Sequence, residues 1–191
     1  ITSGNNVTLV DAGAIDLGVS TVSGTYAVTA TAGGNITDSG VLAVTNGATF
    51  SVDNGRSIIL DQSSTFSSAV TFVASSGTLA AVTINDSTAF DIKALTTTGA
   101  LTVTAGGAIT ESGDLSIAGI TTLAAGSGNN ITLNRVGNNF QAAVIITSGN
   151  NVTLVDAGAI DLGASTVSGT YAVTATSSGD ITDSGVLAIT G

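Results

Sequence analysis

Apolar residues alternate with small or polar residues in short stretches along the whole chain. Apolar side chains two residues apart lie on one side of an extended strand, and the residue between them lies on the other. No stretch shows the helical apolar period without glycine interruptions. The pattern therefore predicts an all-β chain of short strands. The clearest alternating pairs are Val7 and Leu9, Ile15 and Leu17, Val28 and Ala30, Phe50 and Val52, Val82 and Ile84, Phe90 and Ile92, Leu101 and Val103, Leu115 and Ile117, and Ile131 and Leu133.

The chain repeats itself at two levels. Residues 1–46 return as residues 146–191 with six differences, and the octet GGNITDSG (33–40) returns as GGAITESG (106–113) and SGDITDSG (178–185). A fixed period of this kind is typical of repeat architectures. We expect residues 1–191 to form a single continuous β-solenoid, a window of a longer array. Its expected sub-repeats are residues 1–76, 77–148 and a partial unit at 149–191.

A recurring aliphatic step, usually followed by threonine, marks one position in each expected coil. It occurs at Val7, Ile36, Ile58, Val82, Ile109, Ile131, Val152 and Ile181. Its spacing predicts a right-handed parallel β-helix of about eight coils of about 25 residues each. Aliphatic side chains stacked coil on coil should fill the core. The expected core residues are Val7, Leu9, Ile15, Leu17, Val28, Ile36, Leu42, Val44, Ile58, Leu60, Val82, Ile84, Ile92, Leu101, Val103, Ile109, Leu115, Ile117, Ile131, Leu133, Val152, Leu154, Ile160, Leu162, Val173, Ile181, Leu187 and Ile189.

Composition narrows the function classes. The net charge is −10 and the only cations are Arg56, Lys93 and Arg135, which argues against nucleic acid as a partner. The longest unbroken apolar run is Ala142–Ile146, far short of the roughly 20 residues that a membrane-spanning helix needs. With no cysteine, disulfides and thiol chemistry are excluded. We therefore expect neither nucleic-acid binding nor membrane insertion.

Short Val/Ile/Thr strands punctuated by G-N-N, A-G-G and D-S-G resemble the repeat region of filamentous-haemagglutinin-like exoproteins and related tandem β-strand-repeat surface proteins of bacteria. The resemblance covers the whole chain and lies in the general pattern of strand and turn residues, without a single diagnostic motif. The expected coils are longer than the shortest adhesin repeats. The resemblance implies a right-handed parallel β-helix, an extended rod, export across the outer membrane, and a role in adhesion or extracellular assembly. It places the protein outside the cell or on its surface.

One acidic residue follows most of the marked aliphatic positions by two to four residues. The set is Asp11, Asp38, Asp61, Asp86, Glu111, Asp156 and Asp183, with Asn134 as the neutral member. If the coils stack in register, these carboxylates should form a column spaced by about 4.8 Å, and such a column could bind calcium. The favoured interpretation is that each aspartate caps its own turn. We therefore assign no metal site.

Asparagine pairs in G-N-N occupy residues 4–6, 128–130 and 149–151. Asparagine tolerates the left-handed backbone region, so turns are the favoured interpretation. Amide ladders remain an alternative where residues 129–130 and 150–151 fall on successive coils. Tyr26 and Tyr171 are equivalent positions of the repeat, and there is no histidine or tryptophan. We expect no catalytic residue, no cofactor and no enzymatic activity.

The sequence therefore favours a structural or adhesive repeat segment of a secreted bacterial surface protein that forms a rod or filament. Expected partners are further copies, associating end to end or laterally, and the surface of a host or neighbouring cell. The alternative is a surface-layer or matrix component built of β-sandwich modules. A carbohydrate-active β-helix enzyme is the third interpretation, disfavoured because few residues could bind sugar rings or act as a base.

Overall fold

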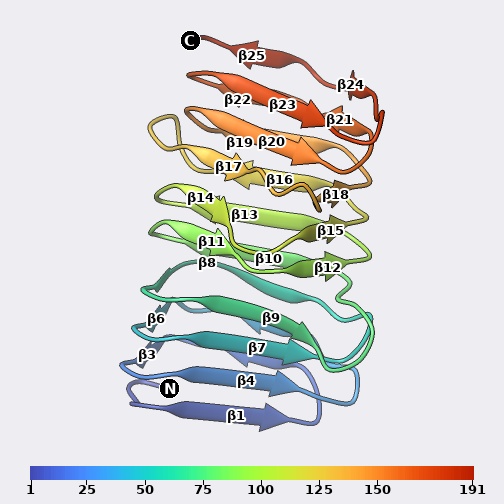
Figure 1. Ribbon diagram of the computed structural model, residues 1–191. Coiled ribbons are helices and arrows are strands. Elements are labelled where there is room, and N and C mark those ends of the chain that lie inside the picture. The colour runs from blue at the N-terminus through green and yellow to red at the C-terminus, as the bar shows by residue number, and fades with distance from the viewer. The chain divides into compact units, whose positions relative to one another are not determined.

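The computed structural model describes all of residues 1–191, as strands and turns without a helix. The strands form two compact units, residues 1–88 (unit 1) and residues 89–191 (unit 2). Within each unit neighbouring strands pair in parallel, and Figure 1 shows the strands of one coil lying against those of the next. Each unit is therefore a parallel β-solenoid. The β-sandwich alternative is wrong, because such sandwiches are built from antiparallel sheets.

Unit 1 has three faces. The first stacks β1 (Val7–Asp11), β4 (Tyr26–Ala30), β7 (Ala48–Val52) and β9 (Val70–Ala74). The second stacks β2 (Ile15–Leu17), β5 (Ile36–Asp38), the start of β8 (Ile58–Phe66) and β10 (Val82–Asp86). The third stacks β3 (Ser20–Val22), β6 (Leu42–Val44) and the end of β8. Since β8 pairs on two faces, it carries the chain around a corner.

Unit 2 also stacks its strands in parallel columns. One column contains β11 (Phe90–Ile92), β14 (Ile109–Glu111), β17 (Ile131–Leu133), β20 (Val152–Asp156) and β23 (Tyr171–Ala175). A second contains β13 (Leu101–Ala105), β16 (Thr121–Ala124), β19 (Val144–Ser148), β21 (Ile160–Leu162) and β24 (Ile181–Asp183). The remaining sheets are formed by β12 (Leu95–Thr97), β15 (Leu115–Ile117) and β18 (Asn139–Phe140), and by β22 (Ser165–Val167) with β25 (Leu187–Ile189).

The stacking of the marked aliphatic positions is confirmed inside each unit. Ile36 pairs with Ile58, and Ile58 pairs with Val82. In unit 2, Ile109 pairs with Ile131, and Ile131 pairs with Val152. Like side chains therefore lie over one another across a parallel ladder, and they form the apolar columns that a solenoid needs for stability.

The coils are shorter than the spacing predicted. Val7 pairs with Tyr26 rather than with Ile36, and Ile181 pairs with Ile160. Register partners lie 19 residues apart at Val7 and Tyr26 and 24 apart at Ile58 and Val82, and the structure holds about nine coils of about 21 residues. The prediction failed here because Val7 and Ile36 lie on different faces, so their spacing spans more than one coil. The right-handed sense of the coil and a single solenoid through residues 1–191 stay predictions.

Most of the expected core is buried, with two groups of exceptions. Val7, Leu9 and Ile15 in the first coil, and Val173 and Leu187 in the last, are only half-buried. Ile181 and Ile189 are 50% and 45% exposed. These residues point inward as predicted, but their coils have a neighbouring coil on one side only, so one side of each apolar side chain stays uncovered.

Aromatic residues contribute to the core of unit 1 in a way that the aliphatic pattern did not predict. Phe50 is fully buried, and its ring lies 6.1 Å from those of Tyr26 and Phe66 and 6.2 Å from that of Phe72. The first two contacts are edge-to-face, an arrangement that ring quadrupoles favour. Three successive coils thus meet at one aromatic cluster.

Candidate functional site

The predicted column of acidic residues does not form. Asp61 lies next to another acid of the set, since its backbone N–H donates to the carboxylate of Asp38. Across the parallel ladders the other six acids face neutral residues: Asp11 faces Ala30, Asp38 faces Leu17, Asp86 faces Ser64, Glu111 faces Ile92, Asp156 faces Ala175 and Asp183 faces Leu162. The prediction is wrong because it placed residues from different faces of the coil in one column. No three His, Cys, Asp or Glu side chains are grouped so that they could hold a metal ion.

The turn-capping role of aspartate is confirmed at three of these positions. The Oδ1 atom of Asp11 accepts a hydrogen bond from the backbone N–H of Gly13 at 2.6 Å, and that of Asp156 accepts one from Gly158 at 2.6 Å. Asp86 accepts one from the backbone N–H of Thr88 at 2.9 Å. Each is a side chain that bonds its own backbone two residues on, which holds the turn after the strand.

Asp38 is also buried, but its hydrogen bonds go to the neighbouring coil instead of to its own turn. Its Oδ1 atom accepts hydrogen bonds from the backbone N–H groups of Asp61 at 2.8 Å and Gln62 at 3.4 Å, while its Oδ2 atom has no partner. Burial, only partly offset by these bonds, raises the pKa of Asp38 to about 6. This carboxylate therefore joins two coils at a cost in desolvation.

Buried polar residues at the corners form a set that the sequence pattern did not reveal. Ser64 Oγ accepts a hydrogen bond from Leu42 N at 2.9 Å, and Asn138 Oδ1 accepts one from Leu115 N at 3.0 Å. Ser165 Oγ and Asp156 Oδ2 accept bonds from Ile146 N at 3.1 Å and Phe140 N at 2.6 Å. We call these four side chains the corner acceptors. The sequence feature that could have identified them is a single polar residue at a position whose side chain should point into the core.

Corner acceptors have a clear structural role. Each accepts a bond from a main-chain N–H group in another coil, at a place where the chain turns from one face to the next. A buried N–H without a partner is costly, so a buried acceptor at the corner stabilises the turn.

Asparagine side chains also connect successive coils. Asn130 and Asn151 do fall on successive coils, as the ladder alternative required, but Asn130 Oδ1 accepts from the backbone N–H of Asn151 at 3.1 Å. Asn151 Oδ1 in turn accepts from Thr170 N at 3.0 Å, and Asn6 Oδ1 from Thr25 N at 2.9 Å. The column is thus made of side-chain-to-backbone bonds between coils instead of an amide-to-amide ladder.

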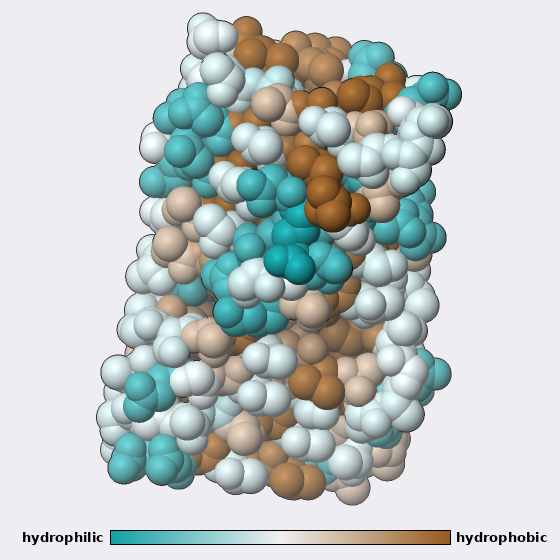
Figure 2. Space-filling view, in the orientation of Figure 1, coloured by the Kyte–Doolittle hydropathy of each residue, from teal (hydrophilic) through white to brown (hydrophobic).

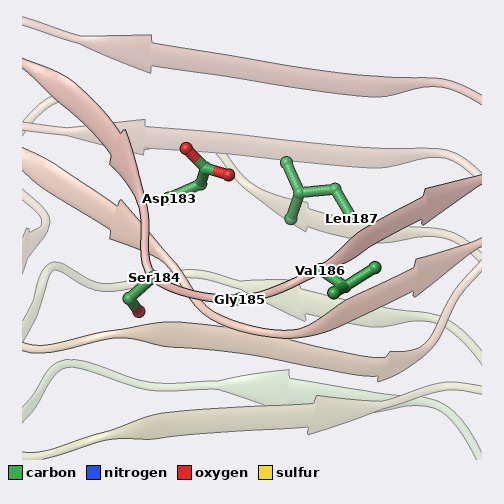
Figure 3. A pocket seen from close by; sticks show the side chains of 5 residues that line it. All are labelled: Asp183, Ser184, Gly185, Val186 and Leu187. Atoms are coloured by element: carbon green, nitrogen blue, oxygen red, sulfur yellow. The ribbon is translucent and has the colours of Figure 1, made fainter.

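The two end coils carry shallow pockets. One is lined by Leu9, Val10, Asp11, Ala14, Ile15 and Asp16 at the first coil. The other is lined by Asp183, Ser184, Gly185, Val186 and Leu187 in the turn between β24 and β25. Figure 3 shows the side chains of Asp183 and Leu187 lying to one side of this turn and that of Ser184 to the other. Both pockets lie where the apolar interior of a unit is uncovered.

Three stretches of the chain, residues 4–73, 79–147 and 149–191, match the family described as repeats of unknown function (DUF5649). No curated protein and no solved structure matches the chain. Among the elements of the structure there is no helix long and apolar enough to span a membrane.

Proposed function

The chain belongs to this repeat family, and we propose that it is a structural, adhesive segment of a secreted bacterial surface protein. In this role it acts without catalysis, cofactor or metal, as a rod or filament outside the cell. The tandem repeats and the solenoid fold of each unit support the structural part of the proposal. The adhesive and extracellular parts rest on the resemblance to exported β-repeat proteins.

The observation that carries the proposal is the stacking of aliphatic residues on one face of successive coils. Ile15, Ile36, Ile58 and Val82 form one buried or half-buried column of unit 1, joined by parallel ladders. Their backbone hydrogen bonds run from coil to coil, along the direction in which the coils stack. Extension along that direction is therefore opposed by many bonds and by the burial of aliphatic surface.

The outward positions support an extracellular setting. They are mostly serine, threonine, asparagine and glycine, with few charges and no cysteine, so that the chain can cross a membrane unfolded without thiol chemistry.

Two of the three cations are held by acidic neighbours, Lys93 by Asp91 and Arg135 by Asp114, each at 2.6 Å. We propose further copies and the surface of a host or neighbouring cell as partners, and neither nucleic acid nor the membrane interior.

Stretching single molecules in optical tweezers tests the mechanical part of the proposal. We expect discrete extensions, each a multiple of the length of one coil, roughly 70 Å of extended chain for about 21 residues. A smooth curve of a flexible polymer would contradict a load-bearing role. Antibody labelling of intact source cells tests the location, and labelling that needs lysed cells would contradict export.

A further inference from the structure

The outward carboxylate of Asp91 on β11 holds an ammonium group of its own chain. Asp91 lies opposite Thr110 of β14, and its Oδ1 atom accepts the Thr110 hydroxyl at 3.2 Å. Its Oδ2 atom accepts the Ser112 hydroxyl at 2.7 Å. Lys93 Nζ donates to the same Oδ2 at 2.6 Å and to Ser112 Oγ at 3.0 Å. An aspartate and two hydroxyl residues of the next coil thus form a cradle for a lysine ammonium group.

The same cradle recurs beside β21, where glycine stands in place of the lysine. Asp161 lies opposite Thr182 of β24, and its Oδ1 atom accepts the Thr182 hydroxyl at 3.4 Å. Its Oδ2 atom accepts the Ser184 hydroxyl at 2.7 Å. Two residues after the aspartate, the position of Lys93 is taken by Gly163. The two cradles belong to different sheets of unit 2, so the arrangement is a property of the strand pair and its sequence.

A pocket with apolar walls adjoins the carboxylate of Asp161. Its volume is about 190 Å³, many times the roughly 15 Å³ that one water molecule needs. Asp161 points outward between the buried Ile160 and Leu162, so the pocket lies on the outward side of the strands and not on the stacking surface of a coil. The apolar lining is Phe140, Ala142, Ala159 and Ile160, and the polar lining is Gln141, Asp161 and Thr182.

Apolar walls beside a carboxylate suit an alkylammonium group. A lysine side chain lays its methylene stem along apolar surface and presents a compact charge with three donors. At Asp91 the lysine is tethered two residues away, which gives it a high effective concentration at its cradle. A lysine from another molecule lacks this tether, and burial of its stem in the pocket at Asp161 compensates for the loss.

Arginine suits this cradle less well than lysine. Its planar guanidinium group binds a carboxylate best through both oxygens at once. Both oxygens of Asp161 already accept hydroxyl groups, from Thr182 and Ser184. The ammonium group of Lys93 uses one carboxylate oxygen and one hydroxyl oxygen, which is the pair that Asp161 and Ser184 also offer.

The lysine must come from a different protein. Lys93 is the only lysine of the chain, and its own cradle already holds it, so a second copy has none to offer. The net charge of −10 attracts a basic partner. Much of the face shown in Figure 2 is white or teal, as expected for a surface of hydroxyl, amide and acidic residues.

We propose that the pocket at Asp161 binds a lysine side chain of a partner protein. The ammonium group lies against Asp161 Oδ2 and Ser184 Oγ, and the alkyl stem lies against Phe140 and Ile160. This inference deepens the proposed adhesive role, on which it rests, by naming the chemical group that the segment recognises on its partner.

Titration of the isotope-labelled 191-residue protein with Nα-acetyl-lysine N-methylamide, followed by backbone amide NMR shifts, tests the proposal. Saturable shifts are expected at Gln141, Asp161 and Thr182, with a dissociation constant of about 1–10 mM at low salt. The norleucine analogue has the stem without the ammonium group and should bind about tenfold or more weakly. The arginine analogue should also bind more weakly than lysine.

Three protein variants separate the cradle from general attraction to an acidic chain. Asp161→Asn should weaken binding of the lysine probe by about tenfold, and Ser184→Ala by about threefold or more. The matched control is Asp180→Asn, which removes the same charge at an exposed residue of unit 2 and should change binding by less than about threefold. Circular dichroism checks that each variant keeps its fold.

Absence of saturable shifts would overturn the proposal, as would equal weakening in Asp161→Asn and Asp180→Asn. Norleucine or arginine analogues that bind as tightly as lysine would overturn the assigned group. The stretching and labelling measurements do not use these probes. Loss of probe binding with stepwise extension and surface labelling retained would therefore refute this inference alone, while labelling that needs lysed cells would refute the extracellular role.

Discussion

Gly34 lies so close to Gly13 of the neighbouring coil that a methyl group at Gly34 would overlap the carbonyl oxygen of Gly13. Gly179 and Gly158 have the same relationship in the second copy. Here glycine is required by the close approach of two backbones at a turn, so both copies keep the pair. Side chains at these turns would push the coils apart and weaken the ladders beside them.

Gly34→Ala should therefore destabilise unit 1 by about 1–3 kcal/mol or more, through overpacking against the backbone. Chemical denaturation read by circular dichroism measures the change. Gly18→Ala is the control, because a Cβ at Gly18 meets nothing within 4 Å. Equal losses of stability in the two variants would show that the close approach of the backbones at Gly34 and Gly13 does not exclude a side chain.

Ser178 occupies a backbone conformation that the first copy gives to glycine. Its φ is 63°, and the equivalent Gly33 has a φ of 85°. Ser178→Gly should stabilise unit 2 by about 1 kcal/mol by relieving left-handed strain. The reverse change, Gly33→Ser, should destabilise unit 1, with additional crowding against the Arg56 side chain. Thermal unfolding of both variants gives the two signs, and the same sign in both would contradict this explanation.

Asp38 should make unit 1 less stable at neutral pH than at pH 4. Its pKa is about 6 in the folded chain against an ordinary 3.8, so the folded state binds more protons between these values. Stability therefore falls as pH rises through this range, by at most about 3 kcal/mol. Asp38→Asn should remove this contribution while its side-chain oxygen still accepts from Asp61 and Gln62. Denaturation midpoints from pH 4 to 7 check this, and an unchanged pH dependence in the variant would exclude Asp38 as its source.

The corner acceptor Ser64 should be needed for stability although it is a small polar residue. Ser64→Ala leaves the buried N–H of Leu42 without its partner, which costs about 1–3 kcal/mol. The adjacent Ser63 is exposed, so Ser63→Ala should change stability by less than about 0.5 kcal/mol. Urea denaturation of the two variants provides the comparison, and similar costs would contradict the corner role.

Two isoleucines at equivalent positions of the repeat should respond differently to truncation. Ile36→Ala removes a fully buried side chain and should cost about 2–5 kcal/mol. Ile181→Ala, at a 50% exposed residue, should cost about 1 kcal/mol or less. Hydrogen exchange, which reads the amides of each unit separately, measures both. Equal costs would mean that Ile181 is covered in solution.

The sequence pattern was sufficient to predict the columns in which similar residues of successive coils stack on one another. Ile36, Ile58 and Val82 begin similar strand sequences, so aligning the repeats also aligned the coils. Coil length was not accessible in the same way, because Val7 lies over Tyr26, a residue with no resemblance to it. Sequence similarity identifies equivalent strands of the repeat. Register partners in a ladder need not be similar in sequence, because it is enough that both side chains point into the core.

The acidic positions failed for the same reason, and the corner acceptors were missed for another. Asp11 and Asp38 end strands of different faces, so no alignment of the repeats brings them together. Ser64 has the composition of any loop serine, and its burial depends on β8 turning a corner in mid-strand. The exposure of Ile189 could not be predicted from the repeat either, because the equivalent residue Val44 is buried.

Unequal spacing between register partners has a consequence for how such chains change over evolutionary time. The interval is 19 residues at Val7 and Tyr26 but 24 at Ile58 and Val82, and yet the aliphatic columns stay aligned. Insertions and deletions are thus absorbed where the chain bends, and each strand keeps its alternation of inward and outward side chains. Segments can therefore be duplicated, lengthened or trimmed by recombination at the bends and still present compatible edges.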